Sequence, residues 1–352
     1  MAEVLISPGV LARENDQSQI TAGPIQAGAA LIGPTVKGQE DIPTLVTSYS
    51  EYQAAFGSTF LSGSNQYTFF TSISAYNYFQ NGGSTLLVTR VTPGAFSQAT
   101  SSYIATGSYS TVPFNVSPFT LATLAEGNIM NSEGPTGSNG TLESGSSDNF
   151  RWEITSPNTS SGVFSLLLRQ GNDTQTSKPV VETYSNLSLD PLAPNYISKV
   201  IGDQVQTVRG TGTDVYLQSS GSYPNASRFI RVSAVNAQTP NYFNNAGTPK
   251  DIFTGSIPIA QSGSFGSGAG DITGSGTPSN FYQAINNTDS QGLVGSDYDI
   301  AINLLGNRDE FRYNVITAPG LILANGTTGA GWTLIQSNCE NRGDAIFVGD
   351  LV

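Results

Sequence analysis

Few residues in this chain are of a type and spacing that could do chemistry. The 352 residues include no histidine, which excludes imidazole general bases, Ser-His-Asp triads and His-ligated metals. Two carboxylate pairs could be imagined as a general acid and base: Asp297 with Asp299, and Asp309 with Glu310. Neighbouring acids in loops usually form a solvated surface. We therefore expect no catalytic residue and interpret the chain as a non-enzyme.

Three further features suggest chemistry but are better explained by structure. Residues 266–271, Gly-Ser-Gly-Ala-Gly-Asp, have the glycines of a phosphate or calcium loop, yet they follow no clear strand, open no helix and occur once. Asp350 follows an apolar strand, where α/β enzymes carry functional groups, but it stands alone. Cys339 falls on an apolar helical face, which favours a core position over a nucleophile. We expect no cofactor and no metal.

The composition indicates a β-rich protein with a weakly charged surface. Charged residues make up 11% of the chain, against roughly 25% in an average soluble domain. The net charge of −12 repels phosphate backbones, so nucleic-acid binding is not expected. The single cysteine excludes an internal disulfide. The N-terminus lacks a basic region, and no stretch reaches the roughly 20 apolar residues of a membrane span, so we expect neither a signal peptide nor membrane insertion.

Residues 67–91 predict a helix followed by a strand. The large apolar residues of this stretch recur at steps of three and four, and so share one helical face: Phe69, Ile73, Tyr76 and Phe79. Asn81-Gly82-Gly83 then ends the helix, because glycine adopts a left-handed backbone without steric cost. Residues 84–91 predict a strand, because their Leu86-Leu87-Val88 is apolar on both faces, which is typical of a strand inside a sheet.

Strands and helices also alternate before this stretch. Residues 29–32 and 44–46 predict strands, bounded by Gly-Pro and Pro. Ser48 and Glu51 have the spacing of a capping box, which predicts a short helix over residues 49–56.

The alternation returns near the end of the chain. Residues 298–305 predict a helix, and residues 311–317 predict a strand that ends at Ala318-Pro319-Gly320. Trp332, Ile335 and Cys339 share one face of a further helix, and residues 345–348 predict a last strand. Strand, helix and strand within about 40 residues indicate a parallel, right-handed βαβ unit. We expect strands near 86–91, 313–317 and 345–348 to lie in one sheet.

The middle of the chain has a different character. From residue 94 to about 276, short strand-like runs alternate with turn residues, which favours a β-sandwich or barrel. The exception is a helix expected over residues 194–200. Residues 263–276 are of low complexity and predict a flexible loop or linker.

These patterns define the fold class as α+β and multidomain. We expect an N-terminal arm at residues 1–22 and a discontinuous α/β domain built from residues 23–92 plus 281–352. A β-rich inserted region, of one or two domains, occupies residues 93–280. In the arm, Val4-Leu5-Ile6 is a short apolar run that can add as an edge strand to another sheet, or form a terminal strand of its own domain.

Six stretches, in order, resemble the contractile tail sheath proteins of long-tailed bacteriophages. They are PGVLARENDQS, TLVTSYSEYQAAFG, YNYFQNGGSTLLVTRV, NLSLDPLAPNYISKVIGD, TAPGL and NRGDAIFVGD. The matches cover roughly residues 5–92, 180–203 and 298–352. The residues matched at the core of these motifs are Phe79, Asn81, Gly82, Gly83, Arg90, Pro319 and Gly320.

The resemblance implies a structural virion protein that polymerises helically around a tail tube and contracts to drive genome delivery. Its implied partners are other sheath subunits, tail tube proteins and baseplate proteins, and its implied location is the virion tail, assembled in the host cytoplasm. The inserted region would form the outer surface. The implied strand-exchange residues of the arm are Val4, Leu5, Ile6, Pro8, Gly9 and Val10.

Sheath proteins continue beyond the point that matches Val352, so the resemblance implies a C-terminally truncated chain. Such a chain is expected to be monomeric, since one of two strand-exchange arms would be missing. The alternative function is a β-rich surface adhesin or carbohydrate-binding structural protein, which the Ser, Thr, Asn and Gly richness also suits. That class predicts internal repeats or a clustered aromatic platform, and neither is found in the sequence.

Overall fold

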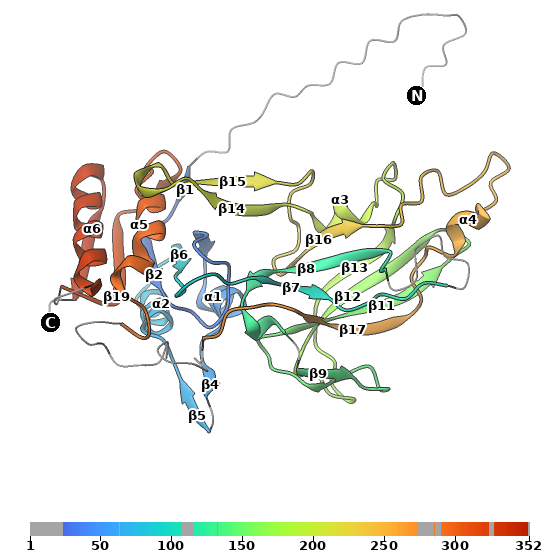
Figure 1. The fold of residues 1–352 in the computed structure, drawn as a ribbon, viewed down its shortest axis with the longest axis horizontal. Coiled ribbons are helices and arrows are strands. Elements are labelled where there is room, and N and C mark those ends of the chain that lie inside the picture. The colour runs from blue at the N-terminus through green and yellow to red at the C-terminus, as the bar shows by residue number, and fades with distance from the viewer. Residues whose placement is uncertain are drawn as a thin grey trace, which may run out of the picture.

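One end of the molecule contains a sheet built from distant parts of the chain (Figure 1). The structure, a computed structural model, describes residues 24–62, 64–107, 116–131, 133–272, 285, 290–323 and 327–350. Five strands lie in the order β20-β19-β2-β6-β3 (Figure 1). Their bounds are Ile346–Asp350 for β20, Val315–Ile322 for β19, Ala29–Gly33 for β2, Leu86–Arg90 for β6 and Thr44–Val46 for β3. All neighbours are parallel except β3 and β6.

The expectation that three distant strands share this sheet is confirmed. β6, β19 and β20 all belong to it, and β19 and β20 form the expected parallel pair. The predicted end of β19 at residue 317 is wrong, because the strand runs through Pro319 and Gly320 to Ile322. A register shift between Thr317 and Ile322 accommodates the proline, which cannot donate to the ladder.

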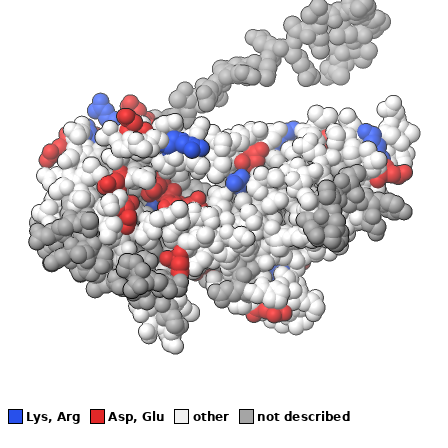
Figure 2. All heavy atoms as spheres, viewed as in Figure 1, with Lys and Arg blue, Asp and Glu red and all other residues white. Residues whose placement is uncertain are grey.

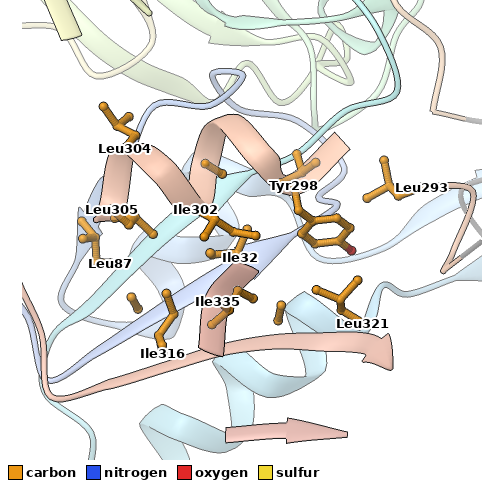
Figure 3. Packing of buried hydrophobic residues seen from close by; sticks show 14 of the residues in the cluster. Ile32, Leu87, Leu293, Tyr298, Ile302, Leu304, Leu305, Ile316, Leu321 and Ile335 are labelled. Atoms are coloured by element: carbon orange, nitrogen blue, oxygen red, sulfur yellow. The ribbon is translucent and has the colours of Figure 1, made fainter. Parts of the chain in front are cut away.

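Helices cover both faces of the sheet. Successive residues of a strand point to opposite sides, so they contact different helices. Ala29 and Leu31 pack with α1 (Tyr49–Phe56) and α2 (Phe70–Gln80). Ala30 and Ile32 pack with α5 (Asp299–Leu305) and α6 (Thr327–Arg342). Figure 3 shows Ile32 and Leu87 of the sheet meeting Ile302 of α5 and Ile335 of α6 in one cluster. Full burial of each such side chain stabilises the fold by roughly 1.5–3 kcal/mol.

The predicted apolar face of α2 is wrong at Ile73 and Tyr76, whereas Phe69 is buried and Phe79 packs on the core. The helix begins at Phe70 rather than Tyr67, and it buries the small residues Thr71, Ser72 and Ala75. Ile73 and Tyr76 point outward, 43% and 45% exposed. The reason is close packing: a Cβ on Gly33 of β2 would lie 2.4 Å from Thr71 Oγ1, so the helix approaches the sheet where both sides are small.

A curled antiparallel sheet of seven strands forms the other large part of the described chain (Figure 1). Its strand order is β13-β12-β11-β17-β7-β8-β16. The bounds, in that order, are Val180–Ser188, Val163–Gln170, Phe150–Asn158, Gln261–Gly266, Gln98–Ser101, Phe119–Glu126 and Ile230–Val235. Its core includes Trp152, Phe164 and Phe265, together with Ile197 and Ile201 of α3 (Ile197–Ile201). The β-rich character of the middle is therefore as expected, whereas the division into domains stays a prediction.

Short elements complete the described chain. The pairs of short strands are β1 (Ile25–Gln26) with β18 (Phe311–Arg312), β4 (Phe60–Ser62) with β5 (Asn65–Tyr67), β9 (Glu133–Thr136) with β10 (Leu142–Ser144), and β14 (Val205–Arg209) with β15 (Tyr216–Ser220). The short helices are η1 (Asn128–Met130), η2 (Gly212–Asp214), α4 (Asp251–Thr254) and η3 (Gly295–Tyr298). Over the described ranges, the helices are all too short or too polar to cross a bilayer.

The predicted linker at residues 263–276 is wrong in its first part. Residues 263–266 belong to β17, a strand in the interior of the seven-stranded sheet. Gly263 lies directly opposite Trp152 of β11, and a Cβ there would lie 2.3 Å from the indole ring. The glycine lets the backbone pass close to the ring. A glycine in this segment is therefore explained by close packing rather than by a flexible linker. Residues 273–276 lie outside the described residues.

Replacing Gly263 by Ala should therefore lower the free energy of unfolding by about 1–3 kcal/mol, the usual cost of overpacking a core. Urea unfolding followed by circular dichroism measures this change. Gly107→Ala is the matched control, since a Cβ at Gly107 would meet nothing within 4 Å. Equal stability of the two variants would restore the linker interpretation.

Candidate functional site: sheet edges and the joint between the sheets

The structure separates the sequence-predicted site residues into two groups. The strand-exchange residues Val4, Leu5, Ile6, Pro8, Gly9 and Val10 lie outside the described residues, so their role stays a prediction. The motif residues lie in or next to the five-stranded sheet. Phe79 belongs to α2, residues 81–83 form the turn that leads into β6, and Arg90, Pro319 and Gly320 belong to strands of the sheet.

The Asn81-Gly82-Gly83 motif ends α2 and directs the chain into β6. Gly82 has a φ of +88°, the left-handed backbone expected at a helix end. The Gly83 amide donates to the Tyr78 carbonyl at 3.0 Å, and a Cβ on Gly83 would lie 2.2 Å from the Tyr78 ring. Tyr78 in turn donates its hydroxyl to the Thr85 carbonyl at 2.8 Å. Both glycines and the partly buried Phe79 thus have a structural role here.

Pro319 and Gly320 mark the bend in β19. Gly320 has a φ of +87°, and its amide donates to Asp350 Oδ2 at 3.0 Å. The buried Ser290 hydroxyl donates to the Gly320 carbonyl at 2.6 Å. Asp350 is therefore an acceptor that holds the end of β19. This structural role accounts for an aspartate at the end of a parallel strand without a catalytic function.

The imagined acid–base pairs do not converge on a cleft. Asp309 and Glu310 are exposed in the turn between α5 and β18. Asp297 accepts a hydrogen bond from the Val294 amide at 2.8 Å, and burial raises the pKa of Asp297 and of Asp299. In the described parts of the chain, no three Cys, Asp or Glu residues are grouped so as to hold a metal ion. Cys339 is half-buried beside the core of the five-stranded sheet, and burial raises the pKa of its thiol.

Arg90, by contrast, occupies a position that its motif did not reveal. It is the last residue of β6, and its side chain is buried. Its Nη1 donates to the Gly38 carbonyl at 2.7 Å and to the Glu126 carbonyl at 2.8 Å. The guanidinium also lies 4.9 Å from the centre of the Phe96 ring. Because Glu126 ends β8, one side chain links the five-stranded sheet to the seven-stranded sheet.

Two acidic residues strengthen the same link. The Glu40 amide donates to Glu126 Oε2 at 2.8 Å, and the Glu126 amide donates to the Gly38 carbonyl at 3.0 Å. Glu40 accepts hydrogen bonds from the Thr92 hydroxyl and, at 3.2 Å, from the Phe96 amide. We call this cluster the joint and define it by its members: Gly38, Glu40, Asp41, Arg90, Thr92, Phe96 and Glu126.

Burial perturbs the ionisable groups of the joint. It raises the pKa of Asp41 to about 8, with further contributions from the negative charges of Glu40, Glu126 and Asp297. It raises the pKa of Glu126 to about 7 and lowers that of Arg90 to about 10. Asp41 Oδ1 and two nitrogens of Arg90, Nε and Nη2, have no hydrogen-bond partner among the described residues. Sequence reasoning missed the joint because Glu126 lies far along the chain from Arg90.

Two other charged pairs connect the sheets beside the joint. Lys37 Nζ lies 3.7 Å from Asp148 Oδ1, and Arg228 Nη1 lies 3.0 Å from Glu51 Oε1. These pairs border a cleft of about 400 Å³ with an apolar lining that includes Val46, Phe56 and Phe229. The cleft follows β3, so one edge of the five-stranded sheet opens onto it.

Both edge strands of the five-stranded sheet lack an outer partner among the described strands. On β20, Ile346 and Val348 are 69% and 56% exposed. On β3, Leu45 is also exposed. An exposed apolar edge strand is a template for pairing with another strand. The face seen in Figure 2 is mostly uncharged, with acidic side chains more frequent at the end that carries the five-stranded sheet.

The class of protein is thus a mixed α/β fold with open sheet edges and no evident catalytic centre in its described part. The chain is similar to a sheath tail protein from Listeria innocua, with 9% identity and a TM-score of 0.43 over 94% of this chain and 48% of that one. It is also similar to a sheath tail protein from Desulfitobacterium hafniense, with 10% identity and a TM-score of 0.35 over 96% of this chain and 51% of that one. The chain thus spans about half the length of each. No family model and no curated protein matches the sequence.

Proposed function

We propose that this chain is a structural, non-catalytic subunit of a contractile bacteriophage tail sheath. The observation that carries the proposal is the ordered set of sequence motifs. Several of these motifs fold into, or lead directly into, the five-stranded sheet, whose two edge strands are open among the described strands. In this proposal, subunits polymerise helically around a tail tube, and the virion tail is where the protein acts.

Assembly would proceed by strand addition between subunits. A strand from a neighbouring subunit, such as the arm near Val4-Leu5-Ile6, would pair with an open edge and gain several main-chain hydrogen bonds. Pairing along β20 would also cover the exposed side chains of Ile346 and Val348. Because donor and acceptor are different surfaces, each contact is head-to-tail, and such contacts generate helices when they do not close into rings. Contraction would then be a rigid-body rearrangement of subunits joined by flexible arms.

The test is assembly of the whole reading frame that contains this chain, examined by electron microscopy. The expected result is hollow tubes of stacked rings. Residues 1–352 alone should instead scatter light as a monomer at about tens of micromolar. The reason is that ordering more than ten arm residues costs about 1–2 kcal/mol each, which offsets the gain from their few apolar contacts. Deleting residues 1–16 from the longer chain should abolish the tubes. Replacing Val4, Leu5 and Ile6 by Ser is the matched variant that keeps the length of the arm.

The opposite results would reject the proposal. If the whole reading frame gives only monomers, or if the tubes persist without the arm, strand addition by residues 1–16 is not the basis of assembly. Specific binding on a glycan array by an unassembled chain would instead favour the adhesin class.

A further inference from the structure

The joint connects the two large sheets through carboxylates that have little compensating charge. Glu40 and Asp41 belong to the segment between β2 and β3, and Glu126 belongs to β8. The Asp41 amide donates to the Arg90 carbonyl at 2.9 Å, which holds its backbone at a left-handed φ of +55°. The left-handed region is uncommon for residues other than glycine, although aspartate is among those enriched there. The backbone contacts thus keep the Asp41 side chain at a buried position.

The charged groups that face Asp41 are nearly all of its own sign. They are Glu40 on the same segment, Glu126 at the end of β8 and Asp297 in η3. Arg90 is the cation of the cluster, and it interacts with Glu126 and Glu40. Within the described residues, no lysine or arginine lies within 4.0 Å of any of these four carboxylates. Burying an unpaired carboxylate costs several kcal/mol unless the group is protonated.

We propose that the joint is a proton-dependent coupling between the two sheets. It is closed while Asp41 and Glu126 hold their protons, and it loosens when both are ionised, because like charges then face one another across the boundary between the sheets. This property does not depend on the proposed role in a tail sheath.

The direction of the effect follows from the two carboxyl groups. Their pKa values in the folded protein, about 8 for Asp41 and about 7 for Glu126, lie above the ordinary values of 3.8 and 4.5. A carboxyl group whose pKa is raised on folding stabilises the folded state fully at a pH below its ordinary pKa. That contribution is lost as the pH rises through the pKa of the folded state. The free energy needed to open the joint should therefore be larger near pH 5 and should decrease progressively up to about pH 8.

Hydrogen exchange detected by mass spectrometry can test this locally. The amides of Glu40, Asp41, Phe96 and Glu126 all donate within or across the joint. After correction for intrinsic exchange, their protection should fall about tenfold or more between about pH 6 and about pH 8.5, since one pKa unit corresponds to a tenfold change. Protection in β12, an interior strand of the seven-stranded sheet that contributes no residue to the joint, should stay constant.

Three variants separate the joint from general charge effects. Asp41→Asn and Glu126→Gln each remove one titrating group at nearly constant shape, and each should reduce the loss of protection at high pH. Asp309→Asn changes the net charge by the same amount at an exposed site and should leave the loss unchanged. The proposal would be overturned by equal protection at both pH values, by a loss spread evenly over the whole chain, or by pH dependence that survives in both joint variants.

Discussion

Replacing Asp173 by Ala is expected to lower the free energy of unfolding by roughly 3–5 kcal/mol, the cost of leaving a buried charge without its partner. Asp173 is buried between two arginines of the seven-stranded sheet. Its Oδ2 accepts from Arg169 Nη2 and lies 3.5 Å from Arg151 Nη1. Arg151 of β11 and Arg169 of β12 lie directly opposite each other, and both side chains are fully buried. Like charges in that position repel, and the Asp173 carboxylate offsets both, while Glu153 forms a further ion pair with Arg169.

Urea unfolding measures the Asp173 effect, with the midpoint and slope reported together. Asp309→Ala provides the matched control, because the same carboxyl group is removed from an exposed turn and should change stability by less than about 0.5 kcal/mol. The double variant Asp173→Ala, Arg151→Met should recover part of the loss, since Arg151 is the arginine left without a carboxylate, whereas Arg169 keeps its ion pair with Glu153. A loss below about 1 kcal/mol in the single variant would mean that water or Glu153 already compensates both arginines.

Replacing Arg90 by Met should have an effect of similar size, roughly 3–5 kcal/mol, at the boundary between the sheets. The substitution removes the donors to the Gly38 and Glu126 carbonyls. It also removes the positive charge that interacts with Glu126 and Glu40, so the remaining carboxylates repel more strongly. The methionine fills much of the space that the arginine stem occupied, which confines the loss largely to polar interactions.

Two tryptophans allow the Arg90 variant to be followed in each sheet separately. Trp152 is buried in the seven-stranded sheet, and Trp332 of α6 packs on the core of the five-stranded sheet. In single-tryptophan proteins, Arg90→Met should make the two unfolding transitions diverge, because the sheets lose a shared contact. Arg231→Met is the control, since that guanidinium donates only to the Gln98 side chain among its described partners. Coincident transitions with an unchanged midpoint would contradict the assigned role of Arg90.

The sequence predicted best the elements whose local signals agree with their environment. β2, β3, α1 and β6 have strong apolar runs or cap residues, and their bounds match closely. The N-cap is an example: the Glu51 amide donates to Ser48 Oγ at 3.1 Å, as its spacing indicates. Such signals lie within a few residues of the element they define, so they can be read without tertiary information.

The errors arise where a distant partner decides. The buried face of α2 depends on Gly33, which lets small residues pack close, whereas apolar periodicity ranks residues by hydrophobicity alone. β17 looks like a linker until Trp152 is known to lie opposite Gly263. The joint was not predicted for the same reason, since Glu40 and Glu126 approach Arg90 from separate parts of the chain. None of these pairings leaves a local pattern in the sequence.

The pairing of β2 with β19 also affects how the chain is made. β2 leaves the ribosome early, whereas its neighbour β19 is synthesised only after every strand of the seven-stranded sheet. Every strand of the seven-stranded sheet lies between them in sequence, so that sheet can form while the other is incomplete. Until β19 is made, β2 therefore lacks a partner on the side away from β6, and unpaired strand edges of this kind invite pairing with other chains. Nascent copies on the same messenger are the nearest strands available, so we expect the rate of translation between β2 and β19 to affect correct folding.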